Sequence, residues 1–506
     1  MGKVNTIHFS RRQKVLDIAV NRTAINQTSA IKYLGLTISA GGSAKVHIDD
    51  TTATVDQVNN FLMILGGCNF GLSPAKAINF FKAFARAKLE YGASALSNLT
   101  KTSQNKIKVC INKYLRRALG LLRSTPVPIL YHLAAELPPQ YRFELSTAKE
   151  LVTNTKLLPN RTTSYAVVYD KFKDVIDNVA STKVITSIPK KLVTQTDFFM
   201  GLAKKKADAN QIIIQQLAQE KVNHLLESGF DVFFTDGSVI GETSCAAFLH
   251  INSDSIQSFY TNKKLSSMTA EILAFLQTAI FAQNQGLTRI AILTDSLSGI
   301  QAVMSKQHRN FLIDEFIEIT NTAFINTEIH FVPGHTNIGP NERVDQAAKN
   351  AAIDGTCLEI KWPIKDAINH IKNSIWKDWS NEYKSIAEQG NSHFFKIFGE
   401  TNKTPWYKKT NLHPDDQKVM NRILSNHTFS NSTLAKMKVV ESGDCEVCNV
   451  EDSISHILFE CTKHSTTRTK FNTFSEILTV EDFMVKHKWE HLYDLVKFIK
   501  EINVKI

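Results

Sequence analysis

Apolar side chains follow two different periods along the chain, and the change of period divides it into regions. Near the middle, residues 231–235 are a β-branched and aromatic run, a composition typical of a strand. Residues 244–252 and 255–261 form two more such runs, with Ser253 and Asp254 between them as turn residues. The pattern therefore predicts a strand followed by a hairpin.

Behind this hairpin, helical and strand-like patterns alternate. Residues 266–284 carry apolar side chains at helical spacing, and residues 289–294 form a further apolar strand. Two short helices, a strand and a last helix are expected after it, at 296–304, 311–324, 328–332 and 341–353. Three strands followed by alternating helices and strands predict a mixed α/β sheet with helices packed on it.

On the N-terminal side, helical periodicity dominates from about residue 51 to 160, after a short strand pair at 31–39. One helix is expected at 104–122, with an apolar side and basic residues largely off it. The apolar side holds Ile107, Ile111, Tyr114, Ala118 and Leu122, and the basic residues are Lys106, Lys108, Lys113, Arg116 and Arg117. The basic face is either a solvated surface or one that follows the phosphates of a nucleic acid.

Other segments are more polar. Residues 160–227 have the pattern of a connector that ends in a helix at 208–227, and residues 364–389 predict another helix. Residues 405–409, with the sequence PWYKK, are basic and aromatic. They are either a capped turn that packs Trp406 or a surface that stacks on bases.

Four acidic residues have distinctive local settings. Asp236 ends the first strand and Asp295 ends the strand at 289–294. Glu271 lies in the first turn of the helix at 266–284, and Asp345 lies on the last helix of the region. Carboxylates at the ends of adjacent strands converge and repel each other unless cations neutralise them, an arrangement that suits two Mg²⁺ ions on a phosphodiester.

The sequence phrases around these acids resemble a type 1 ribonuclease H domain. The resemblance covers roughly residues 228–358, and the matching phrases lie at 235–238, 269–271, 294–296 and 335–345. It implies a ribonuclease H-like mixed five-stranded sheet with flanking helices, in which the four acids hold two magnesium ions. It also implies that His335, ten residues before Asp345, helps to release product.

One departure from the family and two residues within the matching phrases bear on this resemblance. Cellular members of the family carry a basic helical protrusion after the third acid that grips the hybrid, whereas residues 311–324 are acidic and apolar. Grip on a hybrid is therefore expected from elsewhere in the chain. Glu271 has a structural alternative as an acid that interacts with a helix dipole, and Gly237 is expected to let substrate backbone approach the first acid.

Residues 31–150 are similar to the segment that follows the polymerase palm in reverse transcriptases of non-LTR retrotransposons. The phrases that carry this similarity lie at 32–35, 90–92 and 115–120. The palm, with its paired catalytic aspartates, is expected upstream and is absent, so we do not expect polymerase activity. An upstream reverse-transcriptase portion of the same element is a candidate partner.

A second constellation lies near the C-terminus. Cys445 and Cys448 are followed by His456 and Cys461, a spacing that allows three thiolates and an imidazole to surround one structural Zn²⁺. Similar Cys-Cys-His-Cys clusters end many retrotransposon proteins that contain a ribonuclease H domain. The alternative is a set of free thiols beside an incidental histidine.

Composition narrows the class of protein further. The chain has 506 residues and a formal net charge of +11, which allows several domains and favours a polyanionic partner. No apolar stretch is long enough to span a membrane, and the N-terminus lacks the apolar core of a signal peptide. Seven cysteines in such a chain favour a reducing, intracellular compartment, nucleus or cytoplasm, with the oligomeric state left open.

The expected organisation runs through seven segments. In chain order these are the end of a reverse-transcriptase palm (1–50), a helical region like a polymerase thumb or connection (51–160), a connector (161–227), a ribonuclease H domain (228–358), a helical linker (359–440), a zinc segment (441–466) and a C-terminal helix (467–506). The expected function is magnesium-dependent hydrolysis of the RNA strand of RNA–DNA hybrids. The alternative is a catalytically idle remnant of a mobile element that binds nucleic acid.

Overall fold

The computed structural model describes residues 5–10, 14–20, 22–65, 71–93, 99–154, 163–180, 192–195, 211–305, 310–334, 336–390, 393–487 and 489–506. The chain packs as two units. The first, which we call the sheet unit, comprises residues 148–160 and 169–372. The second, the helical unit, comprises residues 1–147, 161–168 and 373–506.

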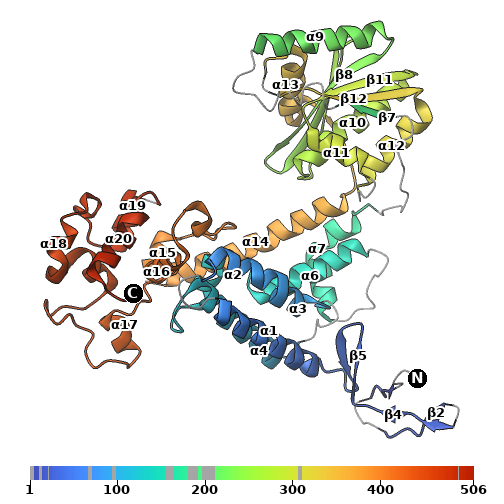
Figure 1. Ribbon diagram of the computed structural model, residues 1–506. Coiled ribbons are helices and arrows are strands. Elements are labelled where there is room, and N and C mark those ends of the chain that lie inside the picture. The colour runs from blue at the N-terminus through green and yellow to red at the C-terminus, as the bar shows by residue number, and fades with distance from the viewer. Residues whose placement is uncertain are drawn as a thin grey trace. The chain divides into compact units, whose positions relative to one another are not determined.

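A seven-stranded mixed sheet forms the centre of the sheet unit, with the strand order β13-β10-β9-β8-β11-β12-β7 (Figure 1). Its five central strands are the predicted ones: β8 (Asp231–Ile240), β9 (Thr243–His250), β10 (Ser255–Thr261), β11 (Arg289–Thr294) and β12 (Asn326–Phe331). The first three are antiparallel, and β11 is parallel to both β8 and β12. This confirms the mixed α/β fold class.

Two edge strands extend the predicted five-stranded sheet. β7 (Leu192–Gln195) pairs in parallel with β12, and β13 (Thr356–Cys357) pairs in parallel with β10. β7 lies in a stretch with little periodicity and β13 has only 2 residues, so neither leaves a pattern in the sequence. The sheet is therefore wider than the sequence predicts.

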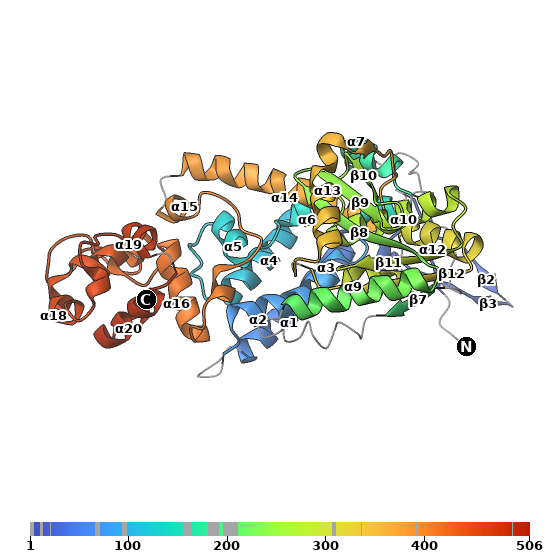
Figure 2. The same cartoon turned by 90° about the horizontal axis from the view of Figure 1, so that it is seen from above.

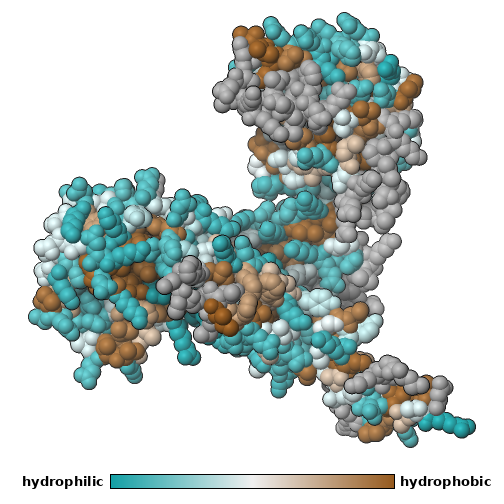
Figure 3. Space-filling model, viewed as in Figure 1, coloured by the Kyte–Doolittle hydropathy of each residue, from teal (hydrophilic) through white to brown (hydrophobic). Residues whose placement is uncertain are grey.

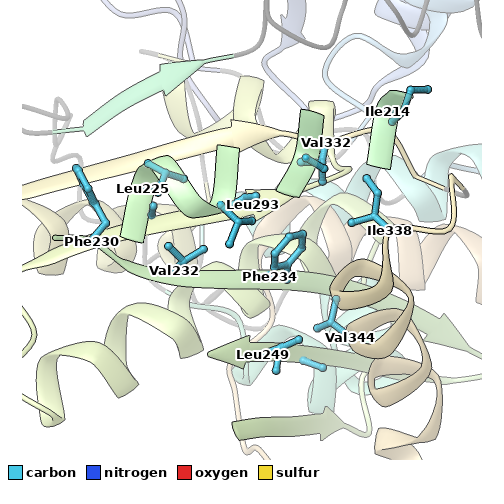
Figure 4. Packing of buried hydrophobic residues seen from close by; sticks show 14 of the residues in the cluster. Ile214, Leu225, Phe230, Val232, Phe234, Leu249, Leu293, Val332, Ile338 and Val344 are labelled. Carbon is cyan, nitrogen blue, oxygen red and sulfur yellow. The ribbon is translucent and has the colours of Figure 1, made fainter. Parts of the chain in front are cut away.

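Helices cover both faces of this sheet. Residues of α9 (Gln211–Glu227) and α13 (Gly339–Asp354) form a single apolar cluster with one face of the strands, shown in Figure 4. α9 lies along β8 in both views of the ribbon (Figures 1 and 2). The opposite face packs on α10 (Ser267–Asn284), which in turn contacts α12 (Phe311–Ala323). The short α11 (Leu297–Met304) follows β11.

Alternation along β8 explains how one strand serves both faces. Val232 and Phe234 point into the cluster with α9 and α13. Phe233 points the other way, where its ring contacts Phe281 of α10 at 6.1 Å between centroids. All three strand residues are fully buried, as expected where helices cover both sides of a sheet.

β8 does not end at Asp236, as the sequence had suggested. The strand continues to Ile240, and Asp236 pairs with Ala247 of β9. The apolar run stops at Thr235, but the ladder to β9 continues through Gly237 and Ser238. The chain reverses only at Gly241 and Glu242, because the antiparallel neighbour holds the polar residues in the sheet.

The N-terminus of α10 is fixed by a residue outside the predicted ribonuclease H segment. Ser266 caps the helix, and the buried Asp366 of α14 (Ile364–Gln389) accepts hydrogen bonds from the Ser266 N–H (2.7 Å) and the Thr269 hydroxyl (2.8 Å). Because the helix begins at Ser267, Glu271 lies in its second turn, not in the first. Its alternative role as an acid at a helix dipole is therefore wrong.

The helical unit confirms the predicted N-terminal helical region. Its helices there are α1 (Lys45–Leu65), α2 (Pro74–Phe80), η1 (Phe81–Arg86), α3 (Ala87–Glu90), α4 (Lys101–Leu119), α5 (Val127–Ala134) and the start of α6 (Pro139–Thr153). α4 begins at Lys101 and ends before Gly120, which adopts a left-handed conformation, so Leu122 lies outside the helix. The strand pair is β5 (Ala30–Tyr33) with β6 (Leu36–Ser39).

The basic face of α4 is largely engaged within the unit. Lys106 and Lys113 make ion pairs of 2.6 and 2.7 Å with Asp49 and Asp56 of α1. Arg116 donates a hydrogen bond to the Thr125 carbonyl. These contacts favour the interpretation of this face as an ordinary solvated surface over a surface that follows phosphates.

The C-terminal part of the helical unit has an aromatic core. Helices α19 (Val480–His487) and α20 (Leu492–Ile502) contribute Phe483 and Phe498, whose rings lie 5.9 and 5.1 Å from that of Phe474. Trp406 is also buried, and its Nε1 donates to Asn421 of α16 (Pro414–Ser425). Trp406 therefore packs a turn and is not free to stack on bases.

Hydrophilic residues cover much of the visible surface of each unit, and smaller apolar patches are scattered among these hydrophilic residues (Figure 3). Within the ranges described above, no helix has the length and apolar character needed to cross a bilayer.

Gly237 is required by the packing of α10 on β8. A Cβ atom at this position would lie 2.3 Å from the Glu271 backbone nitrogen and 2.4 Å from the Ala270 carbonyl carbon. The space beside Gly237 is thus occupied by the chain's own helix, and the expectation that substrate approaches there is wrong. The missing side chain instead brings Glu271 next to Asp236.

We predict that Gly237→Ala destabilises the sheet unit by about 1–3 kcal/mol, because the added methyl must push a buried helix away from the sheet. Hydrogen exchange of β8 amides in increasing denaturant measures this change. The control is Gly339→Ala, whose Cβ would meet no atom within 4 Å. Equal stability of Gly237→Ala and the unaltered protein would contradict this account of the packing.

Candidate functional site

The register of two parallel strands brings the first pair of acids together. β8 and β11 pair Phe234 with Leu293. Asp236 and Asp295 each follow two residues later, so the two acids lie side by side, Asp236 within β8 and Asp295 just past the end of β11. Glu271 reaches this point from α10, and one carboxylate oxygen from each of the three acids lies within 4.8 Å of the others. The structure therefore forms the predicted acidic group from three of its four members.

Burial and mutual repulsion disfavour ionisation of these acids. Burial, followed by the charges of Asp295 and Asp345, raises the pKa of Asp236 from 3.8 to about 7. Burial, followed by the charges of Asp236 and Asp295, raises the pKa of Glu271 from 4.5 to about 9. A nearby cation would remove this repulsion and return both groups to their charged forms.

The arrangement of donors fits a hard divalent cation. The buried Oε2 of Glu271 has no hydrogen-bond partner among the described residues. All three side chains offer oxygen, the ligand atom that Mg²⁺ prefers. Gly334 also packs tightly here, since a Cβ on it would lie 2.1 Å from Asp295 Oδ2. These observations make the triad a candidate magnesium site.

Asp345, the fourth predicted acid, lies beside this triad and outside the 4.8 Å group. It is on α13 and raises the pKa of Asp236, which places its charge close to the site. Its Oδ2 accepts a contact of 2.5 Å from the ammonium group of Lys349, one turn further along the helix. His335, the remaining predicted residue, lies outside the described residues.

The second predicted site is also assembled by the fold. Ligand atoms of Cys445, Cys448, His456 and Cys461 lie within 4.8 Å of one another. The Cys461 sulfur is 3.8 Å from that of Cys445 and 3.9 Å from that of Cys448. Sulfur atoms bound at about 2.3 Å to a tetrahedral zinc ion are separated by roughly 3.8 Å. The spacing therefore suits zinc and is far too long for a disulfide.

Local contacts prepare these residues as metal ligands. Both ring nitrogens of His456 are buried and have no hydrogen-bond partner among the described residues, and the nearest carboxylate oxygen, Oε2 of Glu460, is 3.6 Å from Nδ1. Such burial is costly unless an ion binds there. Thr462, whose hydroxyl lies 3.2 Å from the Cys448 sulfur, lowers the pKa of that thiol to about 6. Convergence of four donors argues against free thiols beside an incidental histidine.

The Cys-Cys-His-Cys cluster does not stand alone as a folding unit. Phe459, between His456 and Cys461, packs against Phe474 and Phe483 with ring centroids 5.6 and 6.2 Å apart. The predicted zinc segment and C-terminal helix thus share one aromatic core.

Three structural contributors to the acidic site were absent from the sequence-based interpretation. Gly334 packs on Asp295, Lys349 pairs with Asp345, and Asp366 caps the helix that carries Glu271. Lys349 could have been found from its i,i+4 spacing to Asp345. The other two depend on tertiary contacts that leave no local pattern.

The mixed sheet, its flanking helices and the acidic triad contributed by β8, α10 and the residue after β11 define an RNase H-like domain. Comparison with known families agrees, since residues 230–353 match the family model described as RNase H. They form an RNase H domain within a longer chain.

Among solved structures, the chain is similar to RNase H1 from the halophilic archaeon Halobacterium salinarum NRC-1. The identity is 18%, the TM-score is 0.22, and the match covers 25% of this chain and 98% of that chain. No curated protein matches the sequence.

The raised pKa values predict how stability depends on pH without metal. Asp236 and Glu271 bind protons more tightly when folded, so the stability of the folded state falls as pH rises from about 4 towards 9. Glu271→Gln removes one repelling charge and should make the metal-free protein progressively more stable than the unaltered one across this range. Thermal unfolding of both proteins in chelator, from pH 5 to 9, measures the difference. A difference that is constant with pH would contradict the assigned repulsion.

For the second site we predict about one zinc per purified chain, because four protein ligands close a structural tetrahedron. Cys448→Ser should lower the zinc content and loosen the segment around His456. Elemental analysis measures the content. The matched control is Cys357→Ser, an exposed cysteine elsewhere, which should leave it unchanged. A content far below one zinc in the unaltered protein would exclude the site.

Proposed function

We propose that this protein is a magnesium-dependent endonuclease that hydrolyses the RNA strand of RNA–DNA hybrids. The observation that carries the proposal is the convergence of Asp236, Glu271 and Asp295 in a partly buried group whose mutual repulsion a cation would relieve. The match of residues 230–353 to the RNase H family supports the same chemistry.

Asp236, Glu271, Asp295 and Asp345 would hold two Mg²⁺ ions. Two such ions supply activation of the attacking water and stabilisation of the leaving 3′ oxygen. The burial of Glu271 and the packing of Gly334 on Asp295 hold these carboxylates in fixed positions. His335 would assist product release, in line with its spacing before Asp345.

Substrate choice would follow the shape of the duplex and its 2′-hydroxyls, with little dependence on base sequence. The net charge of +11 favours binding to the phosphate backbone. α11 and α12 are the described helices between Asp295 and β12, and α12 carries acidic side chains at Asp314, Glu315 and Glu318. Basic residues outside α11 and α12 would therefore bind the hybrid.

The retrotransposon origin is part of the proposal and rests on sequence similarity at residues 31–150 and on the zinc cluster. In this view an upstream reverse-transcriptase portion makes the DNA strand, and this chain removes the RNA template. A catalytically idle nucleic-acid-binding remnant is the competing proposal. The grouped acids favour the active enzyme, because a binding remnant gains nothing from partly buried carboxylates that repel each other.

We predict that Asp236→Asn or Asp295→Asn lowers the rate of hybrid cleavage at least about a hundredfold, since even the outer partners of metal ligands contribute ten- to a hundredfold. His335→Ala should slow turnover without abolishing it. The assay follows a labelled RNA–DNA hybrid with and without Mg²⁺, beside duplex DNA, which should not be cut.

The matched control is Asp254→Asn, an exposed acid in the turn between β9 and β10 that pairs with Arg343. It should cleave at the unaltered rate. Near-normal cleavage by Asp236→Asn, or no cleavage by the unaltered protein in Mg²⁺, would exclude the proposed activity. Equal cleavage of duplex DNA would assign the protein to another class of nuclease.

A further inference from the structure

Lys349 and Asp345 form an ion pair at the edge of the acidic site. The two residues are one turn apart on α13, and the Lys349 Nζ lies 2.5 Å from Asp345 Oδ2. The lysine side chain is 49% exposed and that of Asp345 is 24% exposed, so the pair is open to exchange with solvent. Lys349 therefore sits where a cation from solution would approach this carboxylate.

The charge of Lys349 also reaches the neighbouring acids. The hydrogen bond to Asp345 is the largest influence on Lys349 and raises its pKa, and the charges of Asp236 and Glu342 act in the same direction. In return, Lys349 partly offsets the repulsion that raises the pKa of Asp236. The ammonium group thus already offsets part of the negative charge of Asp236 and Asp345, as a metal ion would.

We propose that Lys349 is a tethered cation that holds Asp345 until the second magnesium ion binds and then releases the carboxylate to it. The inference rests on the proposed function, in which Asp345 would help to hold one of the two ions. An ammonium and a Mg²⁺ on the same carboxylate oxygen repel each other, so the two compete for Asp345.

Two consequences follow for metal binding. The two ions should bind with unequal affinity, tightly at the triad and more weakly at the position that needs Asp345. Removing the ammonium group should tighten the weaker position by about two- to fivefold, the range that an exposed ion pair can supply. The tighter position should change less.

The test is a calorimetric titration of the zinc-loaded, full-length protein with Mn²⁺ as the probe, which reports binding without any assay of activity. Lys349→Met keeps the length of the side chain and removes its charge, and it should tighten the weaker Mn²⁺ site two- to fivefold. Lys349→Arg keeps the charge and should retain the unaltered affinity. Circular dichroism checks that each variant is folded.

A matched control separates competition at Asp345 from a general change in charge. Arg343 lies on the same helix, two residues before Asp345, but pairs with Asp254 at 2.7 Å. Arg343→Met removes the same charge and should leave both Mn²⁺ affinities within twofold. Equal tightening of the weaker Mn²⁺ site in Arg343→Met and Lys349→Met would overturn the inference. So would tightening of that site in Lys349→Arg, which keeps the charge.

Two other outcomes are distinguishable. Two Mn²⁺ sites with no tightening in Lys349→Met would overturn the role of Lys349 and leave the proposed function standing. Absence of Mn²⁺ binding to the acids in the unaltered protein would overturn both.

Discussion

Repulsion between partly buried carboxylates is the constraint on which the candidate site of the sheet unit depends. Asp236, Glu271 and Asp295 are held within a few ångströms of one another, where burial alone already disfavours their charged forms. A fold that only needed stability would replace them, because uncompensated buried charge is costly. A cation bound there would explain why these acids stand together, and the proposed chemistry would follow from it.

The surrounding structure holds the acids together against this repulsion. The parallel register of β8 and β11 sets Asp236 beside Asp295, and the absence of a side chain at Gly237 lets α10 bring Glu271 to them. Asp366 caps the start of α10 from outside the matched RNase H segment. The site is therefore supported by a residue outside the matched segment. The edge strands β7 and β13 also lie outside that segment.

The order and type of the central elements could be predicted because apolar periodicity records which face of each element is buried. Predicted strands and helices between residues 231 and 353 are present with small shifts at their ends. The end of β8 could not be predicted, since the ladder to β9 carries the polar residues beyond Thr235. Nor could the pairing of Lys106 with Asp49, because it depends on a contact between distant segments. The burial of Trp406 was one of the two interpretations of residues 405–409, and its contact with Asn421 decides in favour of it. The acidic group and the Cys-Cys-His-Cys group could be predicted because metal-binding chemistry restricts residue type and spacing. Gly334 and Asp366 act only through tertiary contacts.

The most direct test of the central claim is the number of protons released when Mg²⁺ binds. If Asp236 and Glu271 hold protons because their charges repel, the metal must displace them. Calorimetric titration at pH 7 in buffers of different ionisation enthalpy should then show release of at least about one proton per chain, and Glu271→Gln should reduce it. Binding of Mg²⁺ without proton release would contradict the account.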